Sequence, residues 1–414
     1  MANLLQDANA LATLEIRMSR AKVLIVGGGF GGVKAALELA DSNQHDVTLL
    51  SDQVTLRYYP SLYRTATGGK QANSIISLHK LFENKGVAVV HGSAVTLDRV
   101  AKTITTNDGQ VLGFDSLVLA LGVVTNYFGI EGLEQYSFGI KSIEEAERLK
   151  AHLHQQLTDD RQPDLNYVIV GAGPTGIELA GALMAYVKHL MKKHGIRNRS
   201  IHVDLIEAKT RLLPNMPRDT SRMVGRRLKR LGVKLYVGQA VQAETADSLV
   251  INGRPIRSHT VIWTAGVTNH PFFKANGFTL MHNGKVAVDI FLQAEPDIYI
   301  IGDNANTPYS GMAQTAIHDG EFIAENLKRK AFNKEPESYW AKRPVIAIPV
   351  GEHWAAVLWG RVRLYGWLGW ILRELSDLVG FHDYETWPKA TEQWLTEFGG
   401  EESCPVCASA PQIK

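Results

Sequence analysis

Two glycine-rich turns constrain the fold of this chain more than any other feature of its sequence. Residues 27–32 read GGGFGG and residues 171–176 read GAGPTG, and each follows an apolar run of strand length and precedes a helical pattern. In such a turn the first glycine makes the bend, the second lets backbone N–H groups approach a diphosphate, and the third lets the helix pack on the strand. The motif glycines are Gly27, Gly29 and Gly32 in the first turn, and Gly171, Gly173 and Gly176 in the second.

The repetition of this pattern predicts two dinucleotide-binding units. A single match is weak because glycines also mark ordinary turns, but two matches in the same strand–turn–helix context are hard to obtain from turns alone. Each diphosphate would rest at the positive end of a helix. Further apolar runs predict the other strands of the two sheets, at residues 46–50, 116–120, 201–206, 260–263 and 298–301.

The predicted fold class is α/β, with two Rossmann-like dinucleotide-binding domains and a C-terminal amphipathic helical tail. The second unit is inserted between the parts of the first, and tryptophans concentrate in the tail. The predicted domains are residues 20–135 with 268–332, residues 136–267, a membrane-contact or dimer segment at 333–400, and a mobile tail at 401–414.

Composition excludes several classes of protein. The 44 Lys and Arg residues nearly match the 42 Asp and Glu residues, so the net charge of +2 gives no reason to expect nucleic acid as a partner. The 2 cysteines, Cys404 and Cys407, lie close to the C-terminus, which excludes a disulfide framework and a redox pair in the body. They form half of a zinc knuckle without a second half, so no metal is predicted. Without a signal peptide or a long apolar run, a cytoplasmic compartment is expected.

The residue at the end of the second strand of each unit selects the nucleotide. Glu207 ends that strand in the second unit, where a carboxylate bonds ribose hydroxyls and repels a 2′-phosphate, so NAD(H) is favoured over NADP(H). Lys209 and Arg211 nearby weaken this preference, and the alternative is a solvated charge. In the first unit Ser51 occupies the position and Asp52 follows it, so either Asp52 reaches the ribose or Ser51 makes a weaker bond.

Short motifs between residues 21 and 327 occur in an order known from one family. They read PSLY at 60–63, ATG at 66–68, TNYFGI at 125–130, GPTGIELAG at 173–181, WTAG at 263–266 and GD at 302–303. This series resembles the two-dinucleotide-binding-domain flavoproteins, which are glutathione-reductase-like, and among them the type II NADH dehydrogenases, the non-proton-pumping NADH:quinone oxidoreductases. The resemblance implies that the first unit binds FAD and that the second binds NADH.

The resemblance also implies roles for particular residues. Asp303, after Gly302, corresponds to the aspartate that bonds the FAD ribityl chain, and its alternative is an ordinary strand-end turn. Gly122 ends the family's turn near the flavin, and Gly266 belongs to the NADH site. Glu178 corresponds to a glutamate beside the nicotinamide and the flavin, while its alternative is a helix N-terminal residue that complements the dipole.

Residues 313–316, AQTA, resemble the start of the family's quinone-site motif, which contains Gln314. The motif continues with a second glutamine, but this chain has His318 there. Histidine can bond a quinone carbonyl and deliver a proton, or it can lie on the helix surface without a role. The predicted catalytic residues are Glu178, Gln314 and His318.

The C-terminal segment carries an apolar stripe at helical spacing, which is preceded by Arg361 and Arg363. Such a stripe suits a helix that lies in a membrane interface, although it could equally pack on the body or on a second subunit of a homodimer. The polar residues of this segment lie away from the stripe. The stripe consists of Leu364, Trp367, Leu368, Ile371, Leu375, Leu378 and Val379.

Taken together, these features predict an FAD-dependent enzyme that passes a hydride from NADH to FAD and two electrons to a quinone, on the cytoplasmic face of the cell membrane. Its cysteines exclude the disulfide and sulfide:quinone reductases of the same superfamily. Two alternatives remain. One is a soluble NADH-dependent ferredoxin or rubredoxin reductase with a basic docking face, and the other is an FAD-binding protein similar to apoptosis-inducing factor.

Overall fold

The structure is a computed structural model that describes residues 20–70, 74–158, 166–197 and 199–396. The cysteines Cys404 and Cys407, and the predicted mobile tail, lie outside the described residues. Contacts divide the chain into two compact units, each of which is assembled from separate segments. The first unit contains the segment up to Val54, Leu78–Gly122 and His270–Lys342, and the second contains Thr55–Ser77, Val123–Asn269 and the chain from Arg343 onward.

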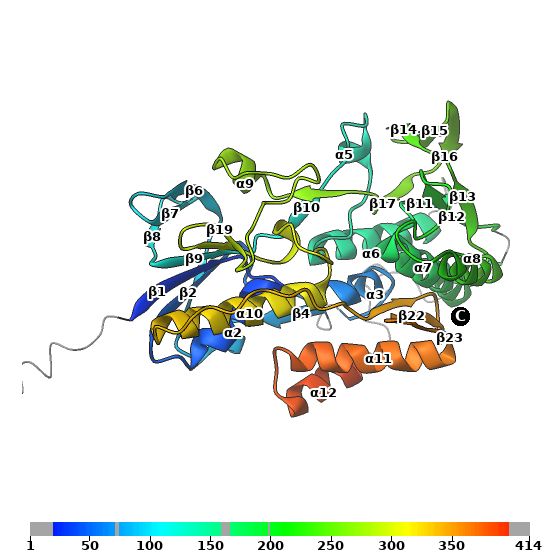
Figure 1. Cartoon of the computed structure of the whole chain (residues 1–414). Coiled ribbons are helices and arrows are strands. Elements are labelled where there is room, and N and C mark those ends of the chain that lie inside the picture. Colours follow the sequence, from blue (N-terminus) through cyan, green and yellow to red (C-terminus); the bar gives the residue numbers. More distant parts are fainter. Residues whose placement is uncertain (1–19, 71–73, 159–165, 198, 397–414) are drawn as a thin grey trace, which may run out of the picture. The chain divides into compact units, whose positions relative to one another are not determined.

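The first unit is built on a six-stranded sheet with the strand order β19-β20-β9-β1-β2-β5 (Figure 1). β1 pairs in parallel with β2 and β9, and β9 pairs in parallel with β20. Their apolar runs are buried on both faces, as parallel strands require. The elements of this unit are β1 (Ala21–Val26), α2 (Phe30–Ala40), β2 (His45–Ser51), α4 (Leu78–Phe82), β5 (Val87–His91), β6 (Ala94–Asp98), β7 (Thr103–Thr106), β8 (Val111–Gly113), β9 (Ser116–Leu119), α9 (Pro271–Ala275), β19 (Gln293–Glu295), β20 (Ile298–Ile300), the 3-10 helix η3 (Gly302–Asn304) and α10 (Ala313–Ala331).

The second unit contains a four-stranded parallel sheet with the order β13-β12-β11-β17. Helices α3, α6 and α7 pack against one another beside it. The elements up to β18 are β3 (Thr55–Arg57), the 3-10 helix η1 (Tyr59–Ser61), α3 (Leu62–Ala66), β4 (Ile75–Ser77), β10 (Val123–Thr125), α5 (Leu133–Tyr136), α6 (Ile143–Thr158), β11 (Asn166–Val170), α7 (Pro174–Lys193), β12 (His202–Glu207), α8 (Arg218–Leu231), β13 (Lys234–Val237), β14 (Val241–Glu244), β15 (Ser248–Ile251), β16 (Arg254–Arg257), β17 (Thr260–Trp263) and β18 (Val267–Asn269).

The C-terminal segment belongs to the second unit and adds an antiparallel sheet of three strands with two helices. Helix α11 packs on all three strands, and α12 packs on α11. Among the described residues, no helix is long and apolar enough to cross a bilayer. The elements are β21 (Ile346–Pro349), β22 (Ala355–Trp359), β23 (Val362–Gly366), α11 (Trp367–His382) and α12 (Trp387–Thr396).

This architecture confirms the predicted fold class. All the strands that the sequence predicts are present, and both glycine turns join a parallel strand to a helix. The unit boundaries differ from the predicted domains, because residues 123–135 lie in the second unit and residues 333–342 in the first. They also differ at Thr55–Ser77, which was expected to belong with the first unit. This segment instead packs with the second unit, because α3 contacts α6 and α7.

Candidate active site

The glycine turn of the first unit has the geometry of a phosphate-binding loop. A Cβ on Gly27 would lie 2.2 Å from the Ala120 carbonyl oxygen, and one on Gly32 would lie 2.0 Å from the Gly27 carbonyl oxygen. Both positions therefore require glycine, and Gly27 also has a φ of 120°. Gly29 is different, because a Cβ there would meet nothing within 4 Å.

The second unit repeats this arrangement. A Cβ on Gly171 would lie 2.6 Å from Ala265 Cα, and one on Gly176 would lie 1.9 Å from the Gly171 carbonyl oxygen. Gly173 again faces open space. In each unit, the first and third glycines close the loop on the protein itself. The middle glycine leaves room that the chain does not fill, at the position where a diphosphate should approach the backbone.

The N-termini of the two helices that follow the turns are suited to bind an anion. Gly29 is the N-cap of α2 and Gly173 is the N-cap of α7, and neither helix has a side-chain cap or an acidic residue in its first turn. Their first N–H groups and the positive ends of their dipoles therefore face the open space above the middle glycine. These features fit one dinucleotide diphosphate on each unit.

The other residues predicted to hold FAD lie at the carboxyl ends of neighbouring strands in the first unit. Gly122 follows β9, and Gly302 and Asp303 follow β20. In open α/β sheets this edge is where ligands bind. Asn304, which sequence analysis missed, accepts a hydrogen bond from the Gly122 N–H at 2.8 Å and donates one to the Gly122 carbonyl at 2.6 Å. Its fully buried side chain fixes the two strand ends together.

A second polar residue that the sequence did not reveal is Asp319 on α10. Its carboxylate accepts hydrogen bonds from the Gly302 N–H at 2.9 Å and from the Tyr339 hydroxyl at 2.7 Å, and it is fully buried. Burial raises its pKa, while the two donors act in the opposite direction. Asp319 thereby holds the Gly302–Asp303 turn against α10, and the only sequence signal was an acidic residue on the apolar face of a helix.

The two candidates at the end of β2 lie in different surroundings. Ser51 is buried, and its hydroxyl donates to the Gln53 carbonyl at 2.8 Å and accepts from the Gln53 N–H at 3.1 Å. A Cβ on Gly28 would lie 2.3 Å from this hydroxyl, so Ser51 packs directly against the glycine turn. Asp52 is exposed. Ser51 is therefore engaged within its own turn, whereas Asp52 is accessible at the end of the strand.

Glu207 is nearly buried at the end of β12 and is held by two backbone donors. One oxygen accepts the N–H of Ala172, inside the glycine turn, at 2.9 Å, and the other accepts the N–H of Lys209 at 2.8 Å. Arg211, which could have favoured a phosphate, donates to the carbonyls of Leu213 and Met216 at 3.0 and 2.7 Å. The carboxylate is thus fixed beside the loop, while the nearby guanidinium is engaged elsewhere.

Gly266 follows β17 and lies against an aromatic ring. A Cβ there would be 2.4 Å from Phe128 Cε2, so glycine is required. Phe128 has a φ of 54°, a conformation that bulky residues rarely adopt, and its side chain is exposed. Trp263 packs edge-on against the same ring, with the ring centroids 6.3 Å apart.

Glu178 lies on α7, within the turn that follows Gly176, and its carboxyl group faces a charged cluster. Burial raises its pKa to about 8, Asp377 acts in the same direction, and Arg373 and Arg64 act against it. The buried hydroxyl of Tyr63 lies near the same charges, and burial raises its pKa as well. Glu178 can therefore hold a proton at neutral pH.

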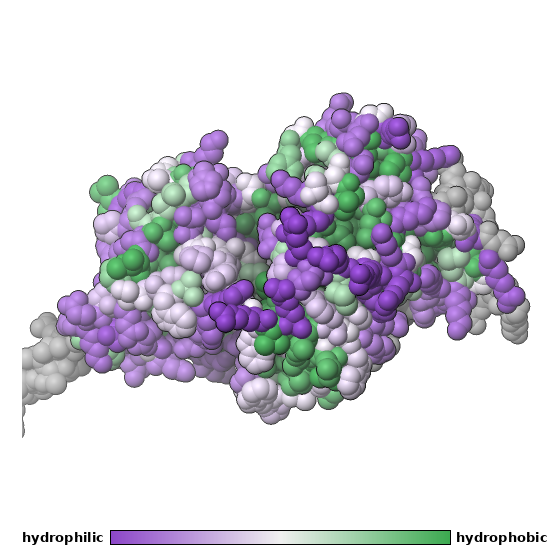
Figure 2. Space-filling model, turned by 45° about the vertical axis from the view of Figure 1, so that its right-hand side comes forward, coloured by the Kyte–Doolittle hydropathy of each residue, from purple (hydrophilic) through white to green (hydrophobic). Residues whose placement is uncertain are grey.

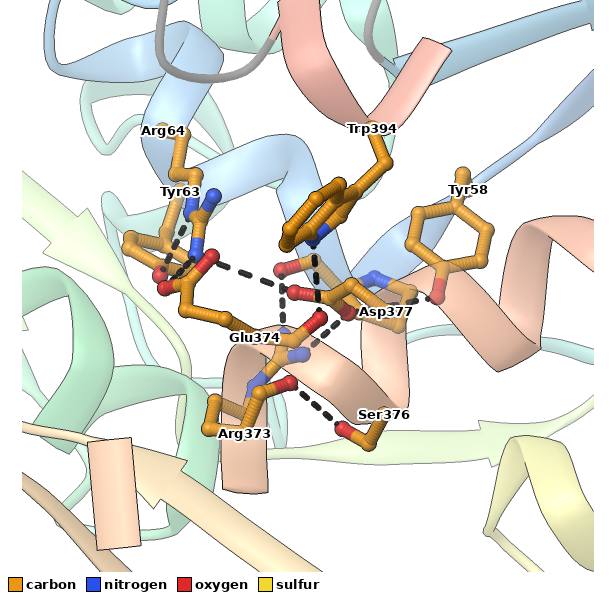
Figure 3. Close-up of polar contacts among 9 residues, drawn as sticks. Tyr58, Tyr63, Arg64, Arg373, Glu374, Ser376, Asp377 and Trp394 are labelled. Carbon is orange, nitrogen blue, oxygen red and sulfur yellow. Dashed lines mark hydrogen bonds and ion pairs between the residues drawn. The ribbon is translucent and has the colours of Figure 1, made fainter. Parts of the chain in front are cut away.

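This charged cluster joins α3 to α11 within the second unit (Figure 3). Arg64 donates to Glu374 at 2.8 Å and lies 3.7 Å from Asp377. Arg373 forms an ion pair with Asp377, which also accepts the Tyr58 hydroxyl at 3.2 Å. Arg373, Glu374 and Asp377 are only 4%, 6% and 1% exposed. This cluster could not be predicted from the sequence, because its members come from segments 310 positions apart.

The predicted quinone-site residues lie on α10 in the first unit. Gln314 is exposed in the first turn of this helix. His318, one turn further on, has its Nε2 3.0 Å from the Trp340 carbonyl oxygen. Its ring lies 5.6 Å from the rings of Tyr339 and Trp340. His318 is therefore in contact with residues 339–340, which cover this part of α10.

The pyridine nucleotide-disulphide oxidoreductase family matches residues 21–320, and the chain belongs to this family. The fold and the two phosphate loops are those of a two-nucleotide oxidoreductase, which agrees with the predicted enzyme class and with FAD and NAD(H) as cofactors.

Proteins similar to this chain indicate a narrower class of oxidoreductase. The chain is 28% identical over 401 residues to the type II NADH:quinone oxidoreductase NdhA of Mycobacterium tuberculosis, covering 88% of this chain and 85% of the relative. It is 27% identical over 335 residues to the type II NADH:quinone oxidoreductase of Staphylococcus haemolyticus, covering 75% and 82%. NDH2 of Plasmodium falciparum, solved in complex with NADH, has the same fold, with a TM-score of 0.82, 17% identity and coverage of 92% and 97%. The resemblance inferred from the motifs is thereby confirmed.

Proposed function

We propose that the protein is an NADH:quinone oxidoreductase that acts at the membrane surface without pumping protons. The observation that carries this proposal is the pair of glycine turns whose middle glycines, Gly29 and Gly173, face open space at a helix N-terminus. FAD, held by the glycine turn of the first unit, would supply the redox chemistry, namely hydride transfer from NADH and transfer of two electrons to the quinone. The chain binds and orients both nucleotides and holds a proton for the quinone.

The experiment that tests this function is a two-step titration without oxygen. Purified protein should be yellow, NADH should bleach the flavin, and a short-chain quinone should restore the colour. An apoptosis-inducing-factor-like protein would bleach very slowly. A ferredoxin reductase would be reoxidised by ferredoxin but not by the quinone, and either result would reject the proposal.

We expect Glu207 to select NADH, because its fixed carboxylate would repel a 2′-phosphate. Replacing Glu207 with Gln removes the charge and leaves one backbone N–H facing an amide N–H. Hydrogen bonds to charged groups contribute about 1.5–3 kcal/mol, so the preference for NADH over NADPH should fall about tenfold or more. The measurement is kcat/KM for both nucleotides. Arg254→Gln, at an exposed position of β16 in the same unit, is the control and should leave the preference unchanged.

Glu178 is proposed to hold the proton that quinone reduction consumes. Because its pKa is raised to about 8, the carboxyl group is protonated below that pH and ionised above it. The rate of quinone reduction should therefore fall as the pH rises through about 8. Glu178→Gln should lack this transition, and it should reduce the quinone about tenfold more slowly than the parent at pH 7. This loss is smaller than the usual contribution of a general acid, because water also reaches this half-buried group. An unchanged pH profile in the variant would remove Glu178 from this role.

Gln314 and His318 remain the proposed quinone contacts, on the strength of their motif and their place on one helix. The ring of His318 lies beside Tyr339 and Trp340, an aromatic setting that suits a flat ligand.

We also propose that α11 contacts the membrane, because this helix buries its charged residues and exposes apolar ones. Its charged residues face inward, whereas Trp367, Leu368, Leu375 and Val379 on the other side are 60%, 59%, 47% and 51% exposed. Figure 2 shows hydrophobic surface on the lower part of the molecule, at the level of α11 and α12 in Figure 1. An apolar exposed face is typical of a helix that lies in a lipid interface. The protein is therefore proposed to bind the cytoplasmic face peripherally.

Flotation with vesicles tests this contact. The double substitution Leu368→Glu/Leu375→Glu should lower the bound fraction at least about tenfold, because burying a leucine side chain contributes about 1.5–3 kcal/mol. Both positions are exposed, so the fold should be retained. Val100→Glu/Val111→Glu, at two exposed positions of the first unit, is the matched control and should float like the parent. Equal flotation of all three proteins would exclude α11 as the contact.

A further inference from the structure

We propose that helix α8 carries a binding surface for anionic lipid headgroups, which makes the membrane contact selective for negatively charged bilayers. This inference rests on the proposed membrane contact of α11. Helix α8 contains six basic residues and a single acidic one. In a chain whose net charge is only +2, this is a strong local concentration of positive charge.

Five of the six cations of α8 are exposed on one side of the helix. Their spacing of three or four residues aligns them along the solvent side, while Val224 and Leu228 are buried on the opposite side. Among the described residues, none of these cations has an ion-pair partner. The exposed cations, which we call the α8 basic face, are Arg218, Arg222, Arg226, Lys229 and Arg230.

The two remaining charged residues of α8, Arg227 and Asp219, interact with other parts of the same unit. Arg227 points inward and donates to the carbonyls of Val350 and Glu352 at 3.1 and 2.8 Å. Asp219 pairs with Arg363 of β23 at 2.6 Å. These two charges thus have partners within the protein, whereas the α8 basic face has no ion-pair partner in the part of the chain that the structure describes. Like charges four residues apart destabilise a helix, so an external anion should stabilise this one.

The position of α8 relative to the apolar face identifies the ligand as a lipid surface. Asp219 and Thr220 of α8 bond to β23, whose Tyr365 hydroxyl lies 3.0 Å from that of Thr220. β23 leads directly into α11, so the α8 basic face and the apolar face belong to one packed body. Figure 2 shows strongly hydrophilic surface directly above the hydrophobic patch. Basic residues and an exposed apolar face within one unit match the headgroups and acyl chains of an anionic bilayer.

An acidic protein such as a ferredoxin is the other partner that a basic face can fit. The observations favour lipid, because α8 belongs to the unit proposed to bind NADH, whereas the flavin, from which electrons would leave, is assigned to the other unit. The exposed apolar residues of α11, in the same unit, also suit acyl chains and not a hydrophilic protein.

The experiment compares flotation with phosphatidylcholine vesicles and with the same vesicles containing phosphatidylglycerol. The parent should bind the anionic vesicles at least about tenfold more strongly, and the difference should vanish near 1 M salt, where the Debye length is about 3 Å. The triple variant Arg222→Gln/Arg226→Gln/Arg230→Gln should lose this difference. Its residual binding to neutral vesicles, through α11, should equal that of the parent.

Two further variants show whether charge is the cause. Arg222→Lys/Arg226→Lys/Arg230→Lys keeps the charge and should bind like the parent, which excludes a folding defect. Lys22→Gln/Lys274→Gln/Lys342→Gln removes three exposed charges from the first unit and should also bind like the parent.

The possible results separate this inference from the proposed function. If the parent binds neither kind of vesicle, the membrane contact itself is wrong and this inference fails with it. Equal binding to neutral and anionic vesicles, or full binding by the glutamine triple variant, would overturn the inference and leave the α11 contact intact. Salt-sensitive binding of a plant-type ferredoxin, without a preference for anionic vesicles, would assign the surface to a protein partner.

Discussion

Purified Gly32→Ala protein should be colourless, and Gly176→Ala protein should be yellow but resistant to bleaching by NADH. A Cβ at either position would lie about 2 Å from the carbonyl oxygen of the first glycine of the same turn. The loop must then open and lose its hydrogen bonds to the diphosphate. If two or three charge-assisted bonds of about 1.5–3 kcal/mol are lost, affinity for the nucleotide should fall at least about 10²-fold. Flavin absorbance measures the loss of FAD from the Gly32 variant, and NADH-dependent bleaching measures the loss of NADH binding by the Gly176 variant.

Two further glycine substitutions sharpen this test. Gly113→Ala is the control, because its Cβ would meet nothing closer than 4.0 Å, and it should behave like the parent. Gly29→Ala should fold normally, since its Cβ has no protein neighbour, yet bind FAD more weakly, because the methyl group would occupy the space assigned to the diphosphate. Normal FAD affinity in the Gly29 variant would mean that the diphosphate does not approach the backbone there.

Arg373→Leu should lower the free energy of unfolding by about 3–5 kcal/mol. This is the usual cost of removing one partner from a buried ion pair, because the remaining charge stays buried without compensation. Here Asp377 is 1% exposed and would keep only the Tyr58 hydroxyl and the more distant Arg64. Urea denaturation followed by tryptophan fluorescence measures the change.

The control for this prediction is Arg361→Leu, at an exposed position, which should change stability little. The double variant Arg373→Leu/Asp377→Leu should be more stable than Arg373→Leu alone, because an apolar pair can replace a buried ion pair at little cost. If the double variant were the less stable of the two, the loss would come from packing of the Arg373 side chain and not from an unpaired carboxylate.

The elements that could be predicted from the sequence are those whose residues act locally. Buried parallel strands appear as uninterrupted apolar runs, so β1, β11 and their neighbours were predicted within a residue or two. The glycine turns were recognisable because a positive φ and the close approach of backbone atoms both demand glycine. Glu207 was placed correctly at the end of β12 for the same local reason.

The rest depends on contacts between distant segments. Asn304 and Asp319 bond to backbone groups that only the folded sheet brings near them. The periodicity of α11 identified which residues share a face, but it could not tell which face turns inward. The charged residues are buried because Arg64 and Tyr58, more than 300 positions earlier, supply their partners. Pattern analysis along the chain has no access to such pairs.

The arrangement of the first sheet has a consequence for biosynthesis. β9 must pair with β20, and the strands of the entire second sheet are translated between these two. A growing chain therefore carries an unfinished sheet edge until residues 298–303 leave the ribosome, and only then can the flavin pocket close. Products that terminate earlier should emerge with an exposed edge strand at β9, which makes them substrates for chaperones and proteases.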